Sequence, residues 1–261
     1  TNKPQTTRNR ICAVVNREGC QFVFLDTPGL HKARTRLGDY MVKVVKESVA
    51  DVDAVLLLVE PIPHIGGPEA ELIRRIKELN VPAVLVINKI DTVEKEELLS
   101  VMQVYGAAHD FAAIVPISAK RNEGVDELLG LLAQFLPEGP QLFPEDMVTD
   151  QPERQVCAEI IREKLLLCLD KEIPHGTAVE ITTFSERDDG IIDLDATIYC
   201  EKASHKGIII GKGGAMLKKI STLARTDIEA FMGTKVFLQT WVKVKENWRD
   251  NMNLIKNFGY R

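Results

Sequence analysis

Short apolar runs alternate with helical stretches along the first half of the chain, and this alternation limits the fold more than any other feature. Three runs are continuous, as strands buried on both faces of a sheet are: 54–59, 83–87 and 113–117. Helical periodicity is found between and around them, over 40–50, 69–79, 95–105 and 125–135. Two earlier runs, 11–15 and 21–25, are joined by a turn that contains glycine and predict an antiparallel hairpin. We therefore expect a mostly parallel α/β sheet that binds its ligand at the carboxyl ends of the strands.

The second half of the chain has a different pattern. Prolines and acidic residues cluster over 136–152, as they do at domain boundaries. The expected elements beyond it are helices over 154–170 and 215–231 and strands over 178–184, 191–199 and 236–244. An extended segment and a glycine-rich turn are expected just before residue 215. The predicted organisation is a first domain over 1–139, a linker over 140–152 and a small α+β domain over 153–261.

Charge is distributed unevenly along the chain. The formal net charge is −5, yet residues 206–261 hold 11 Lys and Arg against 4 Asp and Glu. A polyanion partner is therefore to be sought at this basic end. No apolar run approaches the roughly 18 residues that cross a bilayer. The cysteines form no C-x-x-C pair and the histidines lack zinc-site spacing, which indicates a reduced, cytosolic protein without a zinc site.

The first motif with a chemical meaning is D-T-P-G, directly after the second hairpin strand. At the end of a strand, the Asp26 carboxylate can act through water on a Mg²⁺ ion. Gly29 can offer its backbone N–H to a terminal phosphate because no Cβ obstructs the approach. The other members of this candidate phosphate-side loop are Thr27, Pro28 and Leu30.

Two further motifs follow the buried strands and suit a purine base. In the N-K-x-D pattern of GTPases, here at residues 88–91, the aspartate accepts two hydrogen bonds from guanine that adenine cannot donate. The S-A-K motif resembles the element whose backbone meets the guanine O6. The candidate base-binding residues are Asn88, Lys89, Ile90, Asp91, Ser118, Ala119 and Lys120. The order and placement of these motifs predict a GTPase domain.

Near the start, K-P-Q-T-T-R resembles the first switch of GTPases related to translation factors, in which a threonine hydroxyl reaches Mg²⁺. Its position before Arg8 favours Thr7 over Thr6 as that ligand. The predicted metal ligands are thus Thr7 and Asp26, and the predicted catalytic residues are Thr7, Asp26 and Gly29.

The phosphate-binding loop of such a domain, G-x-x-x-x-G-K followed by Ser or Thr, does not occur in the 261 residues. We therefore expect the first strand and the P-loop to be missing, and these residues alone to bind GTP poorly and to be inactive. Leu30 cannot hydrogen-bond a nucleophilic water, which predicts slow intrinsic hydrolysis. The neighbouring His31 is expected to be an exposed switch residue rather than a base.

The basic end contains I-I-I-G-K-G-G, a G-x-x-G turn in an apolar and basic context. In KH domains this loop lets two backbone segments approach a nucleic-acid strand while an adjacent apolar groove takes splayed bases. The candidate RNA-binding residues are Lys206, Ile210, Gly211, Lys212, Gly213, Gly214, Lys218 and Lys219. A helix first and the order strand, strand, loop, helix, strand match the type II KH topology.

Together these motifs, with A-E-I-I-R-E-K at 158–164 and W-V-K-V-K at 241–245, resemble the Era family from end to end. The resemblance implies a P-loop GTPase-type sheet followed by a type II KH domain, with GTP, GDP and Mg²⁺ as ligands. It implies a factor that binds the 3′ end of 16S rRNA during 30S subunit maturation. It further implies a monomeric cytoplasmic protein with peripheral membrane association.

One alternative of another class stays open on the sequence: a non-enzymatic RNA-binding protein with a degenerate GTPase fold. A tandem-domain GTPase of the Der type would need a second D-T-P-G and a second N-K-x-D, and neither occurs.

Overall fold

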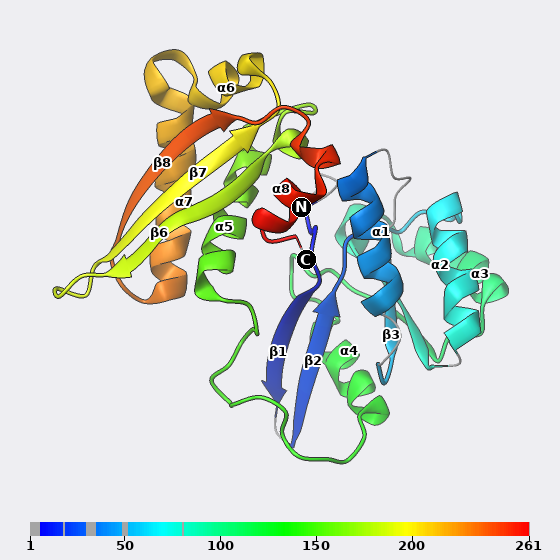
Figure 1. Cartoon of the computed structure of the whole chain (residues 1–261). Coiled ribbons are helices and arrows are strands. Elements are labelled where there is room, and N and C mark those ends of the chain that lie inside the picture. Colours follow the sequence, from blue (N-terminus) through cyan, green and yellow to red (C-terminus); the bar gives the residue numbers. More distant parts are fainter. Residues whose placement is uncertain (1–5, 18, 30–34, 49–51, 80, 261) are drawn as a thin grey trace. The chain divides into compact units, whose positions relative to one another are not determined.

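The computed structural model in Figure 1 describes residues 6–260 except 18, 30–34, 49–51 and 80. Its contacts divide the chain into two compact units. The sheet unit comprises Cys12–Asp26 and Val42–Thr149. The C-terminal unit comprises Thr1–Ile11, Thr27–Met41 and Asp150–Arg261. The domain limits expected from the sequence remain a prediction, and each unit is described by itself.

The sheet unit is built on three parallel strands in the order β3-β4-β5. The strands are β3 (Val55–Val59), β4 (Ala83–Ile87) and β5 (Ala113–Pro116). The helices of this unit are α2 (Gly67–Leu79), α3 (Lys95–Ala108) and α4 (Val125–Leu132), the last continued by η2 (Ala133–Phe135). Alternate residues of β4 enter two different cores: Leu85 packs with residues of α2 and α3, whereas Val86 packs with residues of α4. Both faces of the parallel sheet are therefore covered.

A second, two-stranded sheet pairs β1 (Ile11–Arg17) with β2 (Cys20–Asp26). The strands run in opposite directions in Figure 1, as strands joined by two residues must. Phe22 and Phe24 stack with ring centroids 5.9 Å apart, and Phe22 belongs to the same core as Val86. The irregular segment before residue 150 lies along this hairpin, since Val14 N–H donates to Val148 O at 2.9 Å.

The C-terminal unit contains a three-stranded sheet covered on one face by two helices. Its strands are β6 (Ala178–Glu186), β7 (Ile192–Cys200) and β8 (Val236–Val244), with β6 and β7 antiparallel and β7 and β8 parallel. The covering helices are α5 (Glu153–Cys168) and α7 (Ala215–Met232), which contact each other and the sheet. The short elements are η3 (Pro174–Gly176), α6 (Ala203–Ile210), η4 (Lys212–Gly214), η5 (Trp248–Asp250) and α8 (Met252–Asn257). This is the predicted α+β unit.

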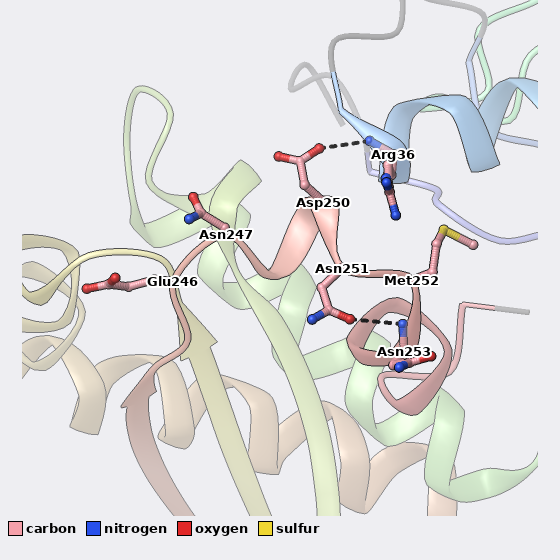
Figure 2. Close-up of a pocket in the computed structure, with 7 residues that line it drawn as sticks. All are labelled: Arg36, Glu246, Asn247, Asp250, Asn251, Met252 and Asn253. Atoms are coloured by element: carbon pink, nitrogen blue, oxygen red, sulfur yellow. Dashed lines mark hydrogen bonds between the residues drawn. The ribbon is translucent and has the colours of Figure 1, made fainter.

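A smaller core lies on the other side of this unit. Trp248, Phe258 and Tyr260 pack there with Leu37 and Met41 of α1 (Arg36–Ser48). Figure 2 shows the neighbouring cavity of about 500 Å³, where the backbone N–H of Arg36 donates to Asp250 at 3.1 Å. The same figure shows the Asn251 side chain capping α8. Segments from both ends of the sequence thus build one core.

The sequence prediction is confirmed for the fold class and wrong for one element. The segment before the glycine loop, expected to be extended, is the helix α6. Its run of isoleucines has high strand propensity, but only Ile209 is fully buried, while Ile208 is exposed. Ile209 is buried in the core that α7 and β8 also line, and this tertiary packing outweighs the strand propensity of the isoleucines. None of the described helices is long and apolar enough to cross a membrane.

We expect Leu85→Ala to destabilise the chain by about 2–5 kcal/mol, because Leu85 has no exposed surface and truncation leaves a cavity. Urea unfolding followed by circular dichroism measures the loss. Leu99→Ala in α3 is the matched control, since that leucine is 62% exposed. Equal losses in the two variants would contradict β4 as the centre of this core.

Candidate nucleotide and nucleic-acid sites

The N-K-x-D motif leaves the central strand of the parallel sheet. The Asn88 N–H donates to Val59 O at 2.9 Å, which extends the ladder one residue beyond β4. Lys89 then adopts a left-handed conformation with φ 66°, and a single turn, η1 (Ile90–Thr92), follows. This turn places Asp91 beside the carboxyl end of β5 instead of continuing in the direction of β4.

The S-A-K motif is hydrogen-bonded to the N-K-x-D turn. Ser118, which has no exposed surface, donates its hydroxyl to Asp91 Oδ1 at 2.8 Å. Asn88 Oδ1 accepts from the backbone N–H of Lys89 at 2.8 Å and of Ala119 at 3.0 Å. The Ser118 hydrogen bond lowers the pKa of the Asp91 carboxyl below its ordinary value, with smaller contributions from Arg121 and Lys120. The motif therefore holds an ionised acceptor and leaves the Asn88 NH₂ group as a donor, which suits guanine.

The structure adds two residues that the sequence analysis did not single out. The backbone N–H of Arg121 donates to Ser118 Oγ at 3.3 Å, and the Arg121 side-chain Nε lies 3.9 Å from Asp91 Oδ2. Gly124 has φ 74°, and a Cβ there would come within 2.8 Å of Pro116 O. Only glycine therefore lets this loop turn back on β5 and pair Ser118 with Glu123. The glycine after N-E was the available signal.

The predicted phosphate-side residues are divided between the two units. Asp26 ends β2 with its side chain exposed, and it belongs to the sheet unit. Thr7, Thr27, Pro28 and Gly29 belong to the C-terminal unit, where Pro28 is buried and Gly29 is exposed. The predictions at Leu30 and His31 lie outside the described residues. The structure thus assembles the base-binding residues within one unit, while the expected metal ligands Thr7 and Asp26 come from different units.

The glycine loop of the C-terminal unit connects α6 to α7 through η4. Gly211 has φ 73°, and a Cβ there would come within 2.7 Å of the Met216 Cβ, so this glycine is needed for close packing against α7. Gly213 and Gly214 also have positive φ, but nothing lies within 4 Å of the Cβ position of either. The loop therefore presents backbone with open space beside it, as a site for a nucleic-acid strand requires.

The predicted basic residues frame this loop. Lys212, Lys218 and Lys219 are exposed, and Lys206 is partly buried. Ile210 is also partly buried and packs against the main core of the unit, so it contributes an apolar wall rather than a free contact. The structure brings these candidates together around one loop, in an arrangement that suits phosphate groups.

Comparison with protein families finds one match in each half of the chain. Residues 4–138 match the model of the elongation factor Tu GTP binding domain, and residues 172–249 match a KH domain model.

Relatives of known identity cover the whole chain. It is 51% identical to GTPase Era of Ruminiclostridium cellulolyticum over 261 residues, which is 100% of this chain and 88% of the relative. GTPase Era of Alkaliphilus metalliredigens gives the same identity and coverage. Two crystal structures at 36% identity cover 100% of this chain and 89% of their own: an Aquifex aeolicus Era variant bound to GDP·AlF₄⁻ (TM-score 0.94), and Era with MgGDPNP and nucleotides 1506–1542 of 16S ribosomal RNA (TM-score 0.95). The chain therefore belongs to the Era family of GTPases.

Proposed function

We propose that the protein binds and hydrolyses GTP, binds the 3′ end of 16S rRNA, and in this way assists maturation of the 30S ribosomal subunit. The observation that carries the proposal is the guanine-type cradle of Asn88, Asp91 and Ser118 in a chain that also presents an open G-x-x-G loop. Family membership supports GTP hydrolysis. The relative crystallised with MgGDPNP and 16S rRNA nucleotides supports both ligand classes.

Guanine selectivity follows from the protonation state of Asp91. Its ionised carboxylate accepts from the two neighbouring N–H groups of guanine, whereas adenine would leave this charge without donors. Ser118 and Arg121 hold the carboxylate in place before the base arrives, so little ordering is needed on binding.

Magnesium binding on the phosphate side is supported by the motifs and by the relative crystallised with MgGDPNP. Mg²⁺ prefers oxygen ligands and is usually held by one or two protein groups together with the substrate phosphates. The Thr7 hydroxyl and the Asp26 carboxylate, acting through water, are the oxygen ligands that the motifs predict. When bound, the ion neutralises charge that develops on the transferred phosphoryl group. Gly29 is the predicted donor of a backbone N–H to the terminal phosphate.

The comparisons give no support to the expectation that the protein is inactive. They concern a family of GTPases, and the sequence argument rested only on the absence of one motif from these 261 residues. A GTPase fold without catalysis, the alternative that the sequence left open, would bind RNA without turning over GTP.

Cellular location and assembly state are part of the proposal. We place the protein in the cytoplasm, which is consistent with the thiols of Cys157 and Cys200, both buried and outside any disulfide. Burial raises the pKa of the Cys157 thiol to about 11. The monomeric state is proposed from the family resemblance. Peripheral membrane association stays a prediction from the family resemblance.

Asp91→Asn tests the guanine site. The amide presents a donor where guanine needs an acceptor, so we expect the full-length variant to lose at least about a hundredfold in GTP affinity. Xanthosine triphosphate, which carries a carbonyl in place of the guanine amino group, should bind better than GTP. Calorimetry with GTP, ATP and xanthosine triphosphate measures this. A wild-type protein that prefers ATP, or a variant with unchanged preference, would refute the assignment.

Gly213→Asp tests the RNA site. A carboxylate in the open loop repels phosphates, so we expect RNA affinity to fall by at least about tenfold while GTP hydrolysis is kept. Gly190→Asp is the matched control, because Gly190 also has positive φ and open space at its Cβ position but lies in the turn between β6 and β7. Fluorescence anisotropy with an oligonucleotide of the 16S rRNA 3′ end reports binding. Equal losses in both variants would count against the G-x-x-G site.

A further inference from the structure

The sheet of the C-terminal unit has a face that points away from α5 and α7. The Thr240 hydroxyl lies 2.8 Å from that of Ser221 in α7, so Thr240 faces the helices and its neighbours on β8 point to the opposite side. Phe258 covers one end of that opposite side, where it stacks on Tyr199 with ring centroids 4.6 Å apart. The remainder, which we call the open face, carries Asp193, Asp195, Phe237, Gln239 and Trp241.

Two large aromatic side chains lie on the open face. Phe237 is 49% exposed and Trp241 is 44% exposed. Both belong to β8, which pairs only with β7 in the three-stranded sheet. They are four residues apart on one strand and therefore lie on the same side, roughly 13 Å from each other. Neither ring is part of the base-binding residues or of the G-x-x-G loop, so the function proposed above leaves the W-V-K-V-K stretch without a role.

The surroundings of Phe237 show what this face binds. The guanidinium carbon of Arg187 lies 5.2 Å from the Phe237 ring centroid. The same guanidinium donates through Nε to Asp193 Oδ2 at 2.8 Å and through Nη2 to the other carboxylate oxygen, which lowers the pKa of the Asp193 carboxyl below its ordinary value. Asp193 is directly opposite Phe237 in the register of β7 and β8. An aromatic ring beside a carboxylate is thus an arginine site on this sheet, and here the chain fills it with its own arginine.

A second ring and carboxylate on the same face lack such an occupant. Asp195 is paired in register with Gln239, one row away from Trp241, which places their Cα atoms roughly 8 Å apart. Among the described residues, no Lys or Arg side chain lies over the Trp241 ring. The Asp195 carboxylate likewise has no ion-pair partner in the described part of the chain. Trp241 and Asp195 are therefore open to a guanidinium from another molecule.

The charge around the open face selects the kind of partner. Residues 180–195, which include most of β6 and the start of β7, hold six Asp and Glu against one Arg. Such a surface repels the phosphates of RNA. A second copy of this chain would bring the same acidic hairpin, and like charges facing each other disfavour association. A basic protein segment, in contrast, has the complementary charge, and the face of a tryptophan ring attracts a guanidinium.

We propose that the open face docks a basic segment of a protein partner and that an arginine of this segment lies over Trp241 and pairs with Asp195. The proposal goes beyond the function proposed above, because it adds a protein-binding face to the unit whose G-x-x-G loop is assigned to RNA. An acidic face and a basic loop attract ligands of opposite charge, so one unit offers separate places for a basic segment and an RNA strand.

The test uses the full-length protein and, as probe, a short dye-labelled peptide of alternating arginine and glycine. We expect Trp241→Ala and Asp195→Asn each to weaken peptide binding by about five- to tenfold, measured by fluorescence anisotropy. Tryptophan fluorescence gives a second readout, because Trp248 has no exposed surface and quenching by acrylamide therefore reports on Trp241. The unlabelled peptide should protect the wild type from this quenching.

Two matched controls separate the site from general effects. Asp188→Asn removes the same charge from the exposed turn between β6 and β7, and Leu223→Ala truncates an apolar side chain of α7 that is 42% exposed. Both should leave peptide affinity within about twofold of wild type. Circular dichroism checks that every variant is folded. Trp241→Ala and Asp195→Asn should keep GTP hydrolysis and the affinity for an oligonucleotide of the 16S rRNA 3′ end.

The outcomes distinguish this proposal from its alternatives. If the wild type does not bind the peptide, or if Asp188→Asn weakens binding as much as Asp195→Asn, no arginine site exists at Trp241 and the proposal is wrong. If oligouridine instead of the peptide protects Trp241 from quenching, or if Trp241→Ala weakens rRNA binding as much as peptide binding, the open face is an RNA surface and the proposal is equally wrong. The function proposed above stands in each case, since it is tested at Asp91 and Gly213.

Discussion

The sheet unit depends on the complete burial of β4. This strand pairs on both sides, sends alternate residues into two cores, and has no freedom to shift register. Its hydrogen-bond ladder continues through Asn88 N–H to Val59 O and through Ile117 N–H to Ile87 O. The loops that carry the N-K-x-D and S-A-K motifs therefore begin next to each other, at the carboxyl ends of β4 and β5. The contact between Ser118 and Asp91 follows from this register, which is why a base-binding site can be built from residues that are 27 positions apart.

The sheet of the C-terminal unit has its two faces covered in two different ways. The helices α5 and α7 cover one of them, and Trp248, Phe258 and Tyr260 pack against residues of β6 and β7 on the other. Arg8 enters this second core and satisfies backbone carbonyls at η3. A buried guanidinium is costly unless most of its donors are used, so its hydrogen bonds select one arrangement of the N-terminal segment.

Much of this organisation could be predicted from sequence, because strand burial and post-strand motifs are local signals. The bounds of β4 and β8 agree with the apolar runs, and Asn88, Asp91 and Ser118 meet as their motifs require. The helix α6 could not be read locally, since three consecutive isoleucines favour a strand and only tertiary packing decides against it. The contact between the Arg162 guanidinium and Thr6 O was equally hidden, because the two residues are 156 positions apart and no periodicity reports such a contact.

The grouping of residues 6–9 with the C-terminal unit has a consequence for how this segment opens. Residues that share a core and its hydrogen bonds unfold locally as one cooperative unit, so we expect the segment to open together with the core around Trp248 and Tyr260. Arg8 donates to two backbone carbonyls at η3 and to the Tyr260 hydroxyl, and a state that frees the segment loses these partners. Because a buried guanidinium without partners is costly, partly open states that keep Arg8 buried are disfavoured.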